Sequence, residues 1–338
     1  MIKWQTQLRE ICLLGCFAFF SNVACASEGI HRPSDAELED LAGESLPHSL
    51  QSVNWQADEP PKTNLLIYAV QPKAYQPKDF KLLATFLGLK SEPQKLPPEI
   101  IYQPGFWIKE ANPTNKEIRA SLVFSEISGM IRFGSGEDNH RWDLKNHKPL
   151  VEGVPNEKDA LQRTLALLPL LGLTTNDLEH LPDGRLKYDC NTEGTWYNDR
   201  HDNGSRKRYT RQINIEFWQK IHAGATVLSI GGAGMLRVGY ISDGRLADIE
   251  MTFRNLTPVG KALPKTSAEL IQMLKRGQGR SFYGYIPDSI TITNCGLVYP
   301  AANATKRQDF LWPFYSMSVV SVENGETNSF QIYEPLEQ

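Results

Sequence analysis

Residue types that bind metal ions occur in this sequence, but their spacing does not match a metal site. The seven histidines form neither an H-E-x-x-H motif nor a zinc signature with paired cysteines. Residues 189–194 resemble the start of a calcium-binding loop, because Asp189, Asn191 and Glu193 place side-chain oxygens at alternate positions. A glycine follows, as in such loops. However, Arg200 occupies the twelfth position, where such a loop needs a bidentate carboxylate. We therefore expect a plain β-turn there, and we expect no metal ion and no cofactor.

Motifs for covalent catalysis are missing from the sequence. It contains no G-x-S-x-G motif and no other nucleophile with an identifiable base. The acidic cluster Glu137, Asp138 and Asp143 leaves open a carboxylate pair of the kind that glycoside hydrolases use. The glycine-rich residues 229–235 lie between two predicted strands, whereas a phosphate-binding loop precedes a helix. These observations favour a protein without enzymatic activity and keep a hydrolase as the alternative.

Cysteine chemistry is limited to two residues once the N-terminal segment is set aside. Three of the five cysteines lie in residues 1–26, so only Cys190 and Cys295 remain. An even number of cysteines in an exported protein is typical of a disulfide, and one interpretation joins these two residues. The other interpretation is two separate buried thiols, because the sequence does not show whether their Cα atoms come within bridging distance.

Large aromatic side chains are concentrated in the second half of the chain. On the predicted strand over residues 213–221, Trp218 falls on the face opposite Ile215 and Phe217. Exposed aromatic side chains on a sheet are typical of binding surfaces. Packing beneath a second module is the alternative explanation. The residues that we expect to form a partner-binding surface are Trp196, Tyr197, Trp218, Tyr283 and Tyr285.

Residues 1–26 have the three parts of a secretory signal peptide. Lys3 and Arg9 provide a positive start, residues 11–20 form an apolar core, and residues 24–26 are a small-x-small cleavage site. The apolar core is shorter than the roughly 20 residues that a membrane-spanning helix needs. An uncleaved anchor and lipidation are the alternatives. We expect a periplasmic or extracellular protein without a transmembrane segment after cleavage.

The charge balance argues against nucleic acid as a partner. Lys and Arg number 36 and Asp and Glu number 39, which gives a formal net charge of -3. Cleavage after residue 26 removes two basic residues and one acidic residue, so the net charge becomes -4. A general nucleic-acid binder needs a basic excess to neutralise phosphates. We therefore expect a protein partner in the envelope or secreted fraction.

The remaining chain is expected to form two folded modules behind a leader. Residues 27–62 are polar and are interpreted as a flexible leader with one short helix, capped by Ser34 with Glu37 three residues later. Residues 63–153 would form the first module, and residues 154–338 the second. In both, a helix precedes antiparallel strands, which predicts an α+β fold with helices packed on antiparallel β-sheets.

Two local patterns support this layout in the second module. Apolar Ile213, Ile215 and Phe217 alternate with polar residues, which indicates a strand with one buried face. A further helix is expected over residues 267–275, with Thr266 as its cap and Glu269 three residues later.

Residues 215–227 resemble a strand–turn–strand motif of the PepSY and thermolysin-propeptide superfamily. In that motif, alternating aromatic and polar residues precede a glycine and then a β-branched residue. Residues 236–246 are similar to the hairpin that follows. Residues 67–133 resemble the first module of exported YycI-like proteins. The resemblance implies two tandem modules with helices on antiparallel sheets, a binding or regulatory activity towards another protein, and no catalytic residues.

We therefore expect an exported, non-catalytic binding or regulatory protein that acts on another envelope or secreted protein. Two alternatives remain at this point. One is a cell-envelope hydrolase whose active site the sequence does not identify, and the other is a structural component of the envelope.

Overall fold

The computed structural model describes residues 30–63, 65–101, 104–111, 119–136, 142–143, 148–149, 154–199, 205–222, 225–229, 233–241, 244–323 and 325–337. The predicted signal peptide lies outside these residues, as do Glu137 and Asp138. Contacts group Arg32–Gln338 into one unit. No helix in the described ranges is long and apolar enough to cross a membrane.

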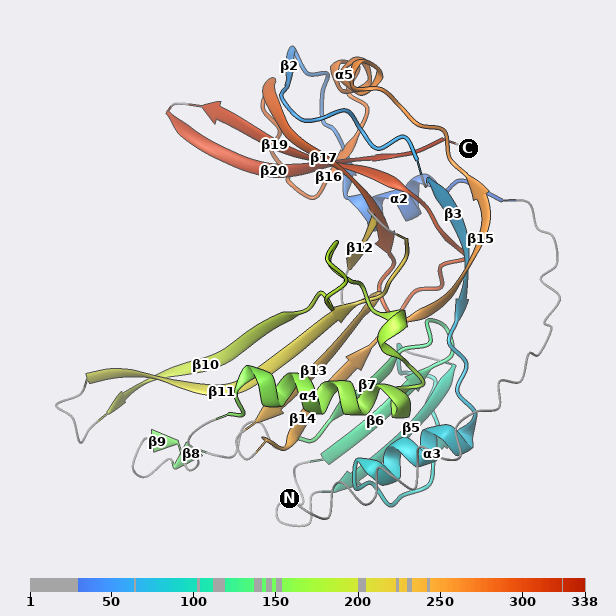
Figure 1. The fold of residues 1–338 in the computed structure, drawn as a ribbon, viewed down its shortest axis with the longest axis vertical. Coiled ribbons are helices and arrows are strands. Elements are labelled where there is room, and N and C mark those ends of the chain that lie inside the picture. The colour runs from blue at the N-terminus through green and yellow to red at the C-terminus, as the bar shows by residue number, and fades with distance from the viewer. Residues whose placement is uncertain are drawn as a thin grey trace. The chain divides into compact units, whose positions relative to one another are not determined.

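Strands dominate the described part of the chain, which contains twenty strands in four sheets and four α-helices (Figure 1). The α-helices are α2 (Asp35–Ala42), α3 (Pro77–Phe86), α4 (Glu157–Leu167) and α5 (Ser267–Lys275). Two short 3-10 helices, η1 (Leu168–Leu171) and η2 (Thr175–Asp177), follow α4. The prediction of helices packed on sheets in two tandem modules is therefore wrong, because the fold is mostly β and its sheets combine both predicted modules.

The largest sheet shows this combination directly. Its eight strands, in spatial order, are β10 (Asp189–Asp199), β11 (Ser205–Trp218), β13 (Met235–Ile241), β14 (Leu246–Met251), β7 (Ile131–Gly134), β6 (Arg119–Ser125), β5 (Gly105–Ala111) and β4 (Gln94–Lys95). At its centre β14 pairs with β7, with Ile249 opposite Phe133. Strands from before and after residue 153 thus share one continuous antiparallel sheet.

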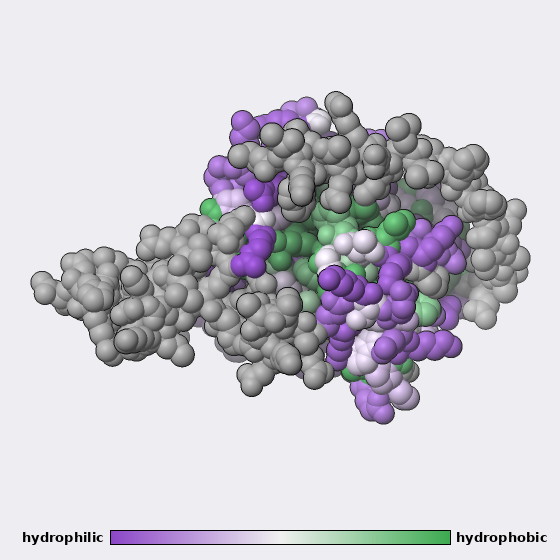
Figure 2. Space-filling model, turned by 90° about the horizontal axis from the view of Figure 1, so that it is seen from below, coloured by the Kyte–Doolittle hydropathy of each residue, from purple (hydrophilic) through white to green (hydrophobic). Residues whose placement is uncertain are grey.

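Alternation gives the eight-stranded sheet one apolar face, which α3 and α4 cover (Figure 1). Ile215 and Phe217 of β11 are fully buried there, as the sequence pattern predicts. They share a core with Phe80 and Leu83 of α3 and with Leu167 of α4. Seen from below in the view of Figure 2, hydrophobic residues gather in a hollow flanked by hydrophilic ones.

The second large sheet contains seven strands. Its path runs β1 (Glu44–Ser45), β16 (Arg280–Ser281), β20 (Glu326–Pro335), β19 (Phe314–Glu323), β17 (Ser289–Ala301) and β12 (Ala225–Ser229), and β2 (Ser52–Trp55) also pairs with β17. The predicted flexible leader, residues 27–62, contains α2, β1 and β2. Its described part is therefore folded. The short helix itself is confirmed, with Ser34 and Glu37 forming a capping box.

Between segments of the two large sheets, the chain forms a smaller sheet of three strands. It consists of β15 (Arg254–Lys261), β3 (Leu66–Pro72) and β18 (Phe310–Leu311). Strand β3 leads into α3, which covers the eight-stranded sheet, and β15 leads from β14 towards α5. The short strands β8 (Trp142–Asp143) and β9 (Lys148–Pro149) pair only with each other.

The two cysteines are free thiols in this structure. Cys190 lies on β10 of the eight-stranded sheet, and Cys295 lies on β17 of the seven-stranded sheet. Of the two interpretations, the structure therefore contains the two separate thiols.

Candidate functional site: an aromatic segment beside a strand edge

The structure describes three of the five aromatic side chains predicted to form one binding surface, and it places Trp218 on one large sheet and Tyr283 and Tyr285 after a strand of the other. Trp196 and Tyr197 lie on β10, but their side chains are outside the described part of the structure. Trp218 ends β11 and is only half-buried, with the Lys187 ammonium 5.4 Å from the centre of its ring. Tyr283 and Tyr285 follow β16 in the other large sheet. Of the three described side chains, Tyr283 and Tyr285 lie in the same short segment.

The surface around them consists of residues 282–285, which we call the aromatic segment. Phe282, Tyr283 and Tyr285 are 58%, 42% and 58% exposed, which is unusual for three large rings so close in sequence. Phe282 was not among the five predicted residues, although its position beside Tyr283 is visible in the sequence. The prediction therefore located the aromatic segment in part.

The aromatic segment is anchored at its start by a close approach of two backbones. Gly43 has a positive φ of 83°, and a Cβ atom there would lie 2.2 Å from the carbonyl oxygen of Ser281. Only glycine satisfies both conditions. The adjacent residue, Glu44, then pairs with Ser281 between β1 and β16. The backbone that precedes Phe282 is thereby held in place.

Side-chain contacts fix the aromatic segment against β20. The Ser281 hydroxyl donates a hydrogen bond to the Gln331 carbonyl oxygen (2.8 Å) and accepts one from the Tyr283 amide (3.1 Å). The Tyr283 ring stacks on Phe330 with a centroid distance of 5.2 Å and an interplanar angle of 6°. The rings of Phe282 and Tyr333 meet edge to face at 6.0 Å. The exposed rings are therefore held in defined positions.

Tyr285 is fixed by a charged partner at the tip of the β19–β20 hairpin. Its hydroxyl donates a hydrogen bond to Glu323 Oε1 at 3.1 Å. This hydrogen bond, together with the negative charge of Glu323, raises the pKa of Tyr285. The exposed Glu326 pairs with Glu323 across the hairpin, so the tip carries two carboxylates.

Next to the aromatic segment, the outer edge of β20 has backbone groups for which the described residues provide no strand partner. Strand β20 pairs with β19 along its whole length, but its only pair with β16 is Tyr333 opposite Arg280. The Gln331 carbonyl points to this outer side, because it accepts the Ser281 hydroxyl. Since alternate residues of an antiparallel strand point the same way, Thr327 and Ser329 direct their N–H and C=O groups outward too.

A different polar arrangement occupies the face of the eight-stranded sheet opposite to α3 and α4. Glu193 accepts hydrogen bonds from Asn214 (2.9 Å), Arg211 (3.1 Å) and Arg237 (3.4 Å). Burial opposes ionisation of Glu193, but these donors and charges hold its pKa below the usual range. Because each charge of this network lies against an opposite charge, we interpret it as part of the fold, although Arg211 Nε and Arg237 Nε are buried without a hydrogen-bond partner among the described residues.

Metal-binding residues do not converge in the part of the chain that the structure describes. There, no group of three or more His, Cys, Asp or Glu side chains is placed to hold a metal ion.

Comparisons with known proteins give little further information. No protein-family model matches the chain, and no curated protein matches it. Among solved structures, an uncharacterized protein from Eubacterium rectale aligns with a TM-score of 0.39 and 10% sequence identity, over 84% of this chain and 86% of that chain. The resemblance to PepSY and YycI-like proteins therefore stays a prediction.

Proposed function

We propose that this protein binds an extended segment of another exported protein along the outer edge of β20. The observation that carries the proposal is the position of three exposed rings, Phe282, Tyr283 and Tyr285, beside outward-pointing backbone groups of the same sheet. Such an edge can accept an additional strand through main-chain hydrogen bonds. Aromatic side chains next to it would supply most of the binding energy.

The charge of the hairpin tip indicates which partner fits. Glu323 and Glu326 place two carboxylates at the end of the strand edge, and the rings of Phe282 and Tyr285 are exposed nearby. A lysine or arginine in the added strand would be attracted by the carboxylates and by the face of an aromatic ring. The proposed partner is therefore an extended segment that carries basic side chains. The signal-like residues 1–26 support placing this interaction in the periplasm or outside the cell.

The experiment compares three variants with the mature protein in affinity capture from the exported fraction. Ser329→Pro blocks strand addition without removing a bond to β19, because the Ser329 N–H points outward. Phe282→Ala combined with Tyr285→Ala removes the aromatic contacts. Val259→Ala combined with Leu263→Ala is the control, since both side chains are exposed outside the aromatic segment. Thermal unfolding of each variant confirms that it is folded.

The expected result is a stoichiometric partner that binds the mature protein and the control, and is lost from the two other variants. Hydrogen exchange should also slow at the Thr327 and Ser329 amides when this partner binds. A partner that all variants retain, or repeated captures without any partner, would overturn the proposal.

A further inference from the structure

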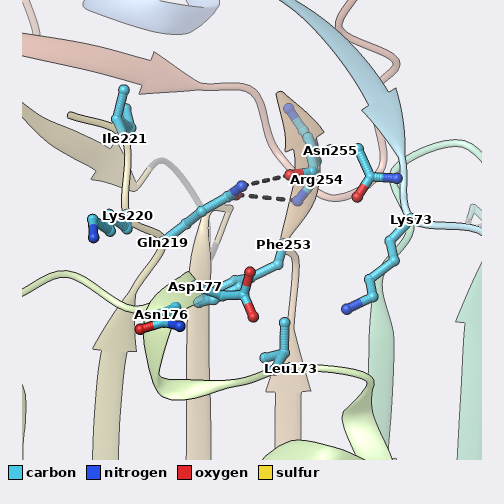
Figure 3. Close-up of a pocket in the computed structure, with 10 residues that line it drawn as sticks. All are labelled: Lys73, Leu173, Asn176, Asp177, Gln219, Lys220, Ile221, Phe253, Arg254 and Asn255. Carbon is cyan, nitrogen blue, oxygen red and sulfur yellow. Dashed lines mark hydrogen bonds between the residues drawn. The ribbon is translucent and has the colours of Figure 1, made fainter. Parts of the chain in front are cut away.

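A pocket opens where four connecting segments meet, away from the aromatic segment (Figure 3). The segments are the end of β3, the turn between η1 and η2, the connection from β11 to β12, and the step from β14 to β15. The cavity has a volume of about 240 Å³. Because an apolar cavity of about 150 Å³ can hold benzene, this space suits a ligand somewhat larger than benzene.

One wall of the pocket presents the Lys73 ammonium, and two glycines hold that lysine in place. Gly129 has a φ of 72°, and a Cβ atom there would lie 2.5 Å from the Lys73 backbone nitrogen. Gly172 has a φ of 61°, and its carbonyl oxygen accepts a hydrogen bond from Lys73 Nζ. Since an ammonium group has three N–H donors, two remain for a ligand. Burial lowers the pKa of Lys73 to about 8, although the charge of Asp177 opposes this effect.

The opposite wall presents the Asp177 carboxylate. Its Oδ2 atom accepts hydrogen bonds from the Thr174 amide (2.7 Å) and hydroxyl (2.8 Å), which cap η2. The Asp177 carbonyl oxygen accepts the Lys220 amide at 2.9 Å, which ties η2 to the connection after β11. Figure 3 shows the side chains of Asp177 and Lys73 directed towards the same space from two sides. They form no ion pair within 4.0 Å, so a gap separates the two charges.

The floor of the pocket is apolar, and side-chain amides lie along its remaining side. Leu173 and Phe253 form the floor and are 4% and 2% exposed. The exposed Asn255 side chain lies beside Lys73 (Figure 3). Gln219 is not available to a ligand, because its amide binds both backbone groups of Arg254. The Lys220 side chain points away from the space (Figure 3).

We propose that this pocket binds a free α-amino acid with an apolar side chain. The ligand's carboxylate would accept hydrogen bonds from Lys73 and Asn255, and its ammonium group would donate to Asp177. Its side chain would pack on Leu173 and Phe253. Leucine, with about nine non-hydrogen atoms, matches the available volume. This site is independent of the strand edge, so the two proposals can fail separately.

Calorimetric titration of the mature protein tests the proposal with three related probes. L-leucine carries both charges, L-leucinamide lacks the carboxylate, and N-acetyl-L-leucine lacks the ammonium group. We expect L-leucine to bind at least ten-fold more tightly than either analogue, because each charged hydrogen bond contributes strongly in a partly buried site. Equal affinities for the three probes, or no binding at millimolar concentration, would overturn it.

Three variants assign the two charges to named residues. Lys73→Met removes the ammonium, and Asp177→Asn removes the carboxylate charge while keeping an oxygen that can accept the Thr174 amide. Both should weaken leucine binding at least ten-fold. Lys220→Met is the matched control, since it removes a positive charge from a residue of the same pocket whose side chain points away. Loss of binding in the control, or full binding in the other two folded variants, contradicts the assignment.

Discussion

Gly239, in the middle of β13, shows how one missing side chain can hold a polar network together. A Cβ atom at this position would lie 2.2 Å from Gln212 Nε2 and 2.6 Å from Asp248 Oδ2. Without it, Gln212 donates hydrogen bonds to Asn214 Oδ1 and to Asp248 Oδ2, both at 2.6 Å. Glycine therefore makes room for buried amides on a sheet face that would otherwise be too crowded.

We predict that Gly239→Ala lowers the free energy of unfolding by about 1–3 kcal/mol, because the added methyl group overpacks this network. Gly296→Ala on β17 is the matched control, since a Cβ atom there would have no neighbour within 4 Å. It should be neutral or slightly stabilising, because alanine reduces the entropy of the unfolded chain. Urea denaturation of both variants checks the prediction, and equal effects would contradict it.

Glu334 is a buried carboxyl group whose surroundings make its contribution to folding stability depend on pH. It is 5% exposed, and burial raises its pKa to about 7 even though Lys265 Nζ lies 3.8 Å away. Between the ordinary pKa of 4.5 and about 7, the folded protein therefore binds more protons than the unfolded chain. The contribution of Glu334 to folding stability therefore falls as the pH rises through this range.

We predict that Glu334→Gln removes this contribution. The variant should gain stability relative to the wild type as the pH rises from 4.5 to 8, by at most about 3 kcal/mol. Denaturation of both proteins across this range measures the difference, and other acidic groups cancel because both proteins share them. A difference that stays constant with pH would show that Glu334 ionises normally.

Helix beginnings are the elements that the sequence predicts best. At α5, the Thr266 hydroxyl accepts the Glu269 amide at 3.2 Å, and the Glu269 carboxylate accepts the Thr266 amide at 2.7 Å. The same capping box occurs at α2, and Asn156 caps α4. These contacts span only three residues, so neighbours along the chain are sufficient to specify them.

Thr266→Ala should cost about 1 kcal/mol of folding free energy, because the Glu269 amide loses the hydroxyl that accepts it and the Glu269 carboxylate loses the hydroxyl that donates to it. The exposed Gln272 lies on the same helix, so Gln272→Ala serves as the control and should have little effect. Thermal and urea denaturation of both variants provide the measurement. A loss in the control as large as in Thr266→Ala would count against the capping explanation.

The positions of the two cysteines predict how many thiols the denatured protein exposes. Since Cys190 and Cys295 lie in separate sheets as free thiols, the denatured mature protein should react with two equivalents of a thiol reagent without prior reduction. Finding no reactive thiol would restore the disulfide interpretation.

Arg254 connects parts of the chain that belong to different sheets. It begins β15, and its backbone binds Gln219 after β11 of the eight-stranded sheet. Its guanidinium donates to Gln308 Oε1 and, at 2.8 Å, to the Ala302 carbonyl that follows β17 of the seven-stranded sheet. Burial lowers the pKa of Arg254 to about 10, so the side chain stays charged at neutral pH.

We predict that Arg254→Met costs about 2–4 kcal/mol of folding free energy, because the buried Ala302 carbonyl loses its donor. Arg307→Met is the control, since Arg307 is exposed and pairs with Asp309 at the surface. Such a pair contributes about 1 kcal/mol or less. Denaturation followed by two spectroscopic probes measures both variants, and similar losses would contradict the connecting position of Arg254.

The sequence by itself determined the local features of this protein. Helix caps at Ser34 and Thr266 and the alternation along β11 were predicted because they depend on residues a few positions apart. Even the exposed rings of Tyr283 and Tyr285 were located, although their companion Phe282 was left out.

Only the tertiary structure decided which strands pair and which side chains meet. The pairing of β7 with β14 joins segments more than a hundred residues apart, and the same is true of β2 with β17. Alternation shows that a strand has a buried face but does not identify its neighbour. For this reason the prediction of a two-module fold was wrong. The pocket between Lys73 and Asp177 has no sequence pattern, because long-range packing alone brings its walls together.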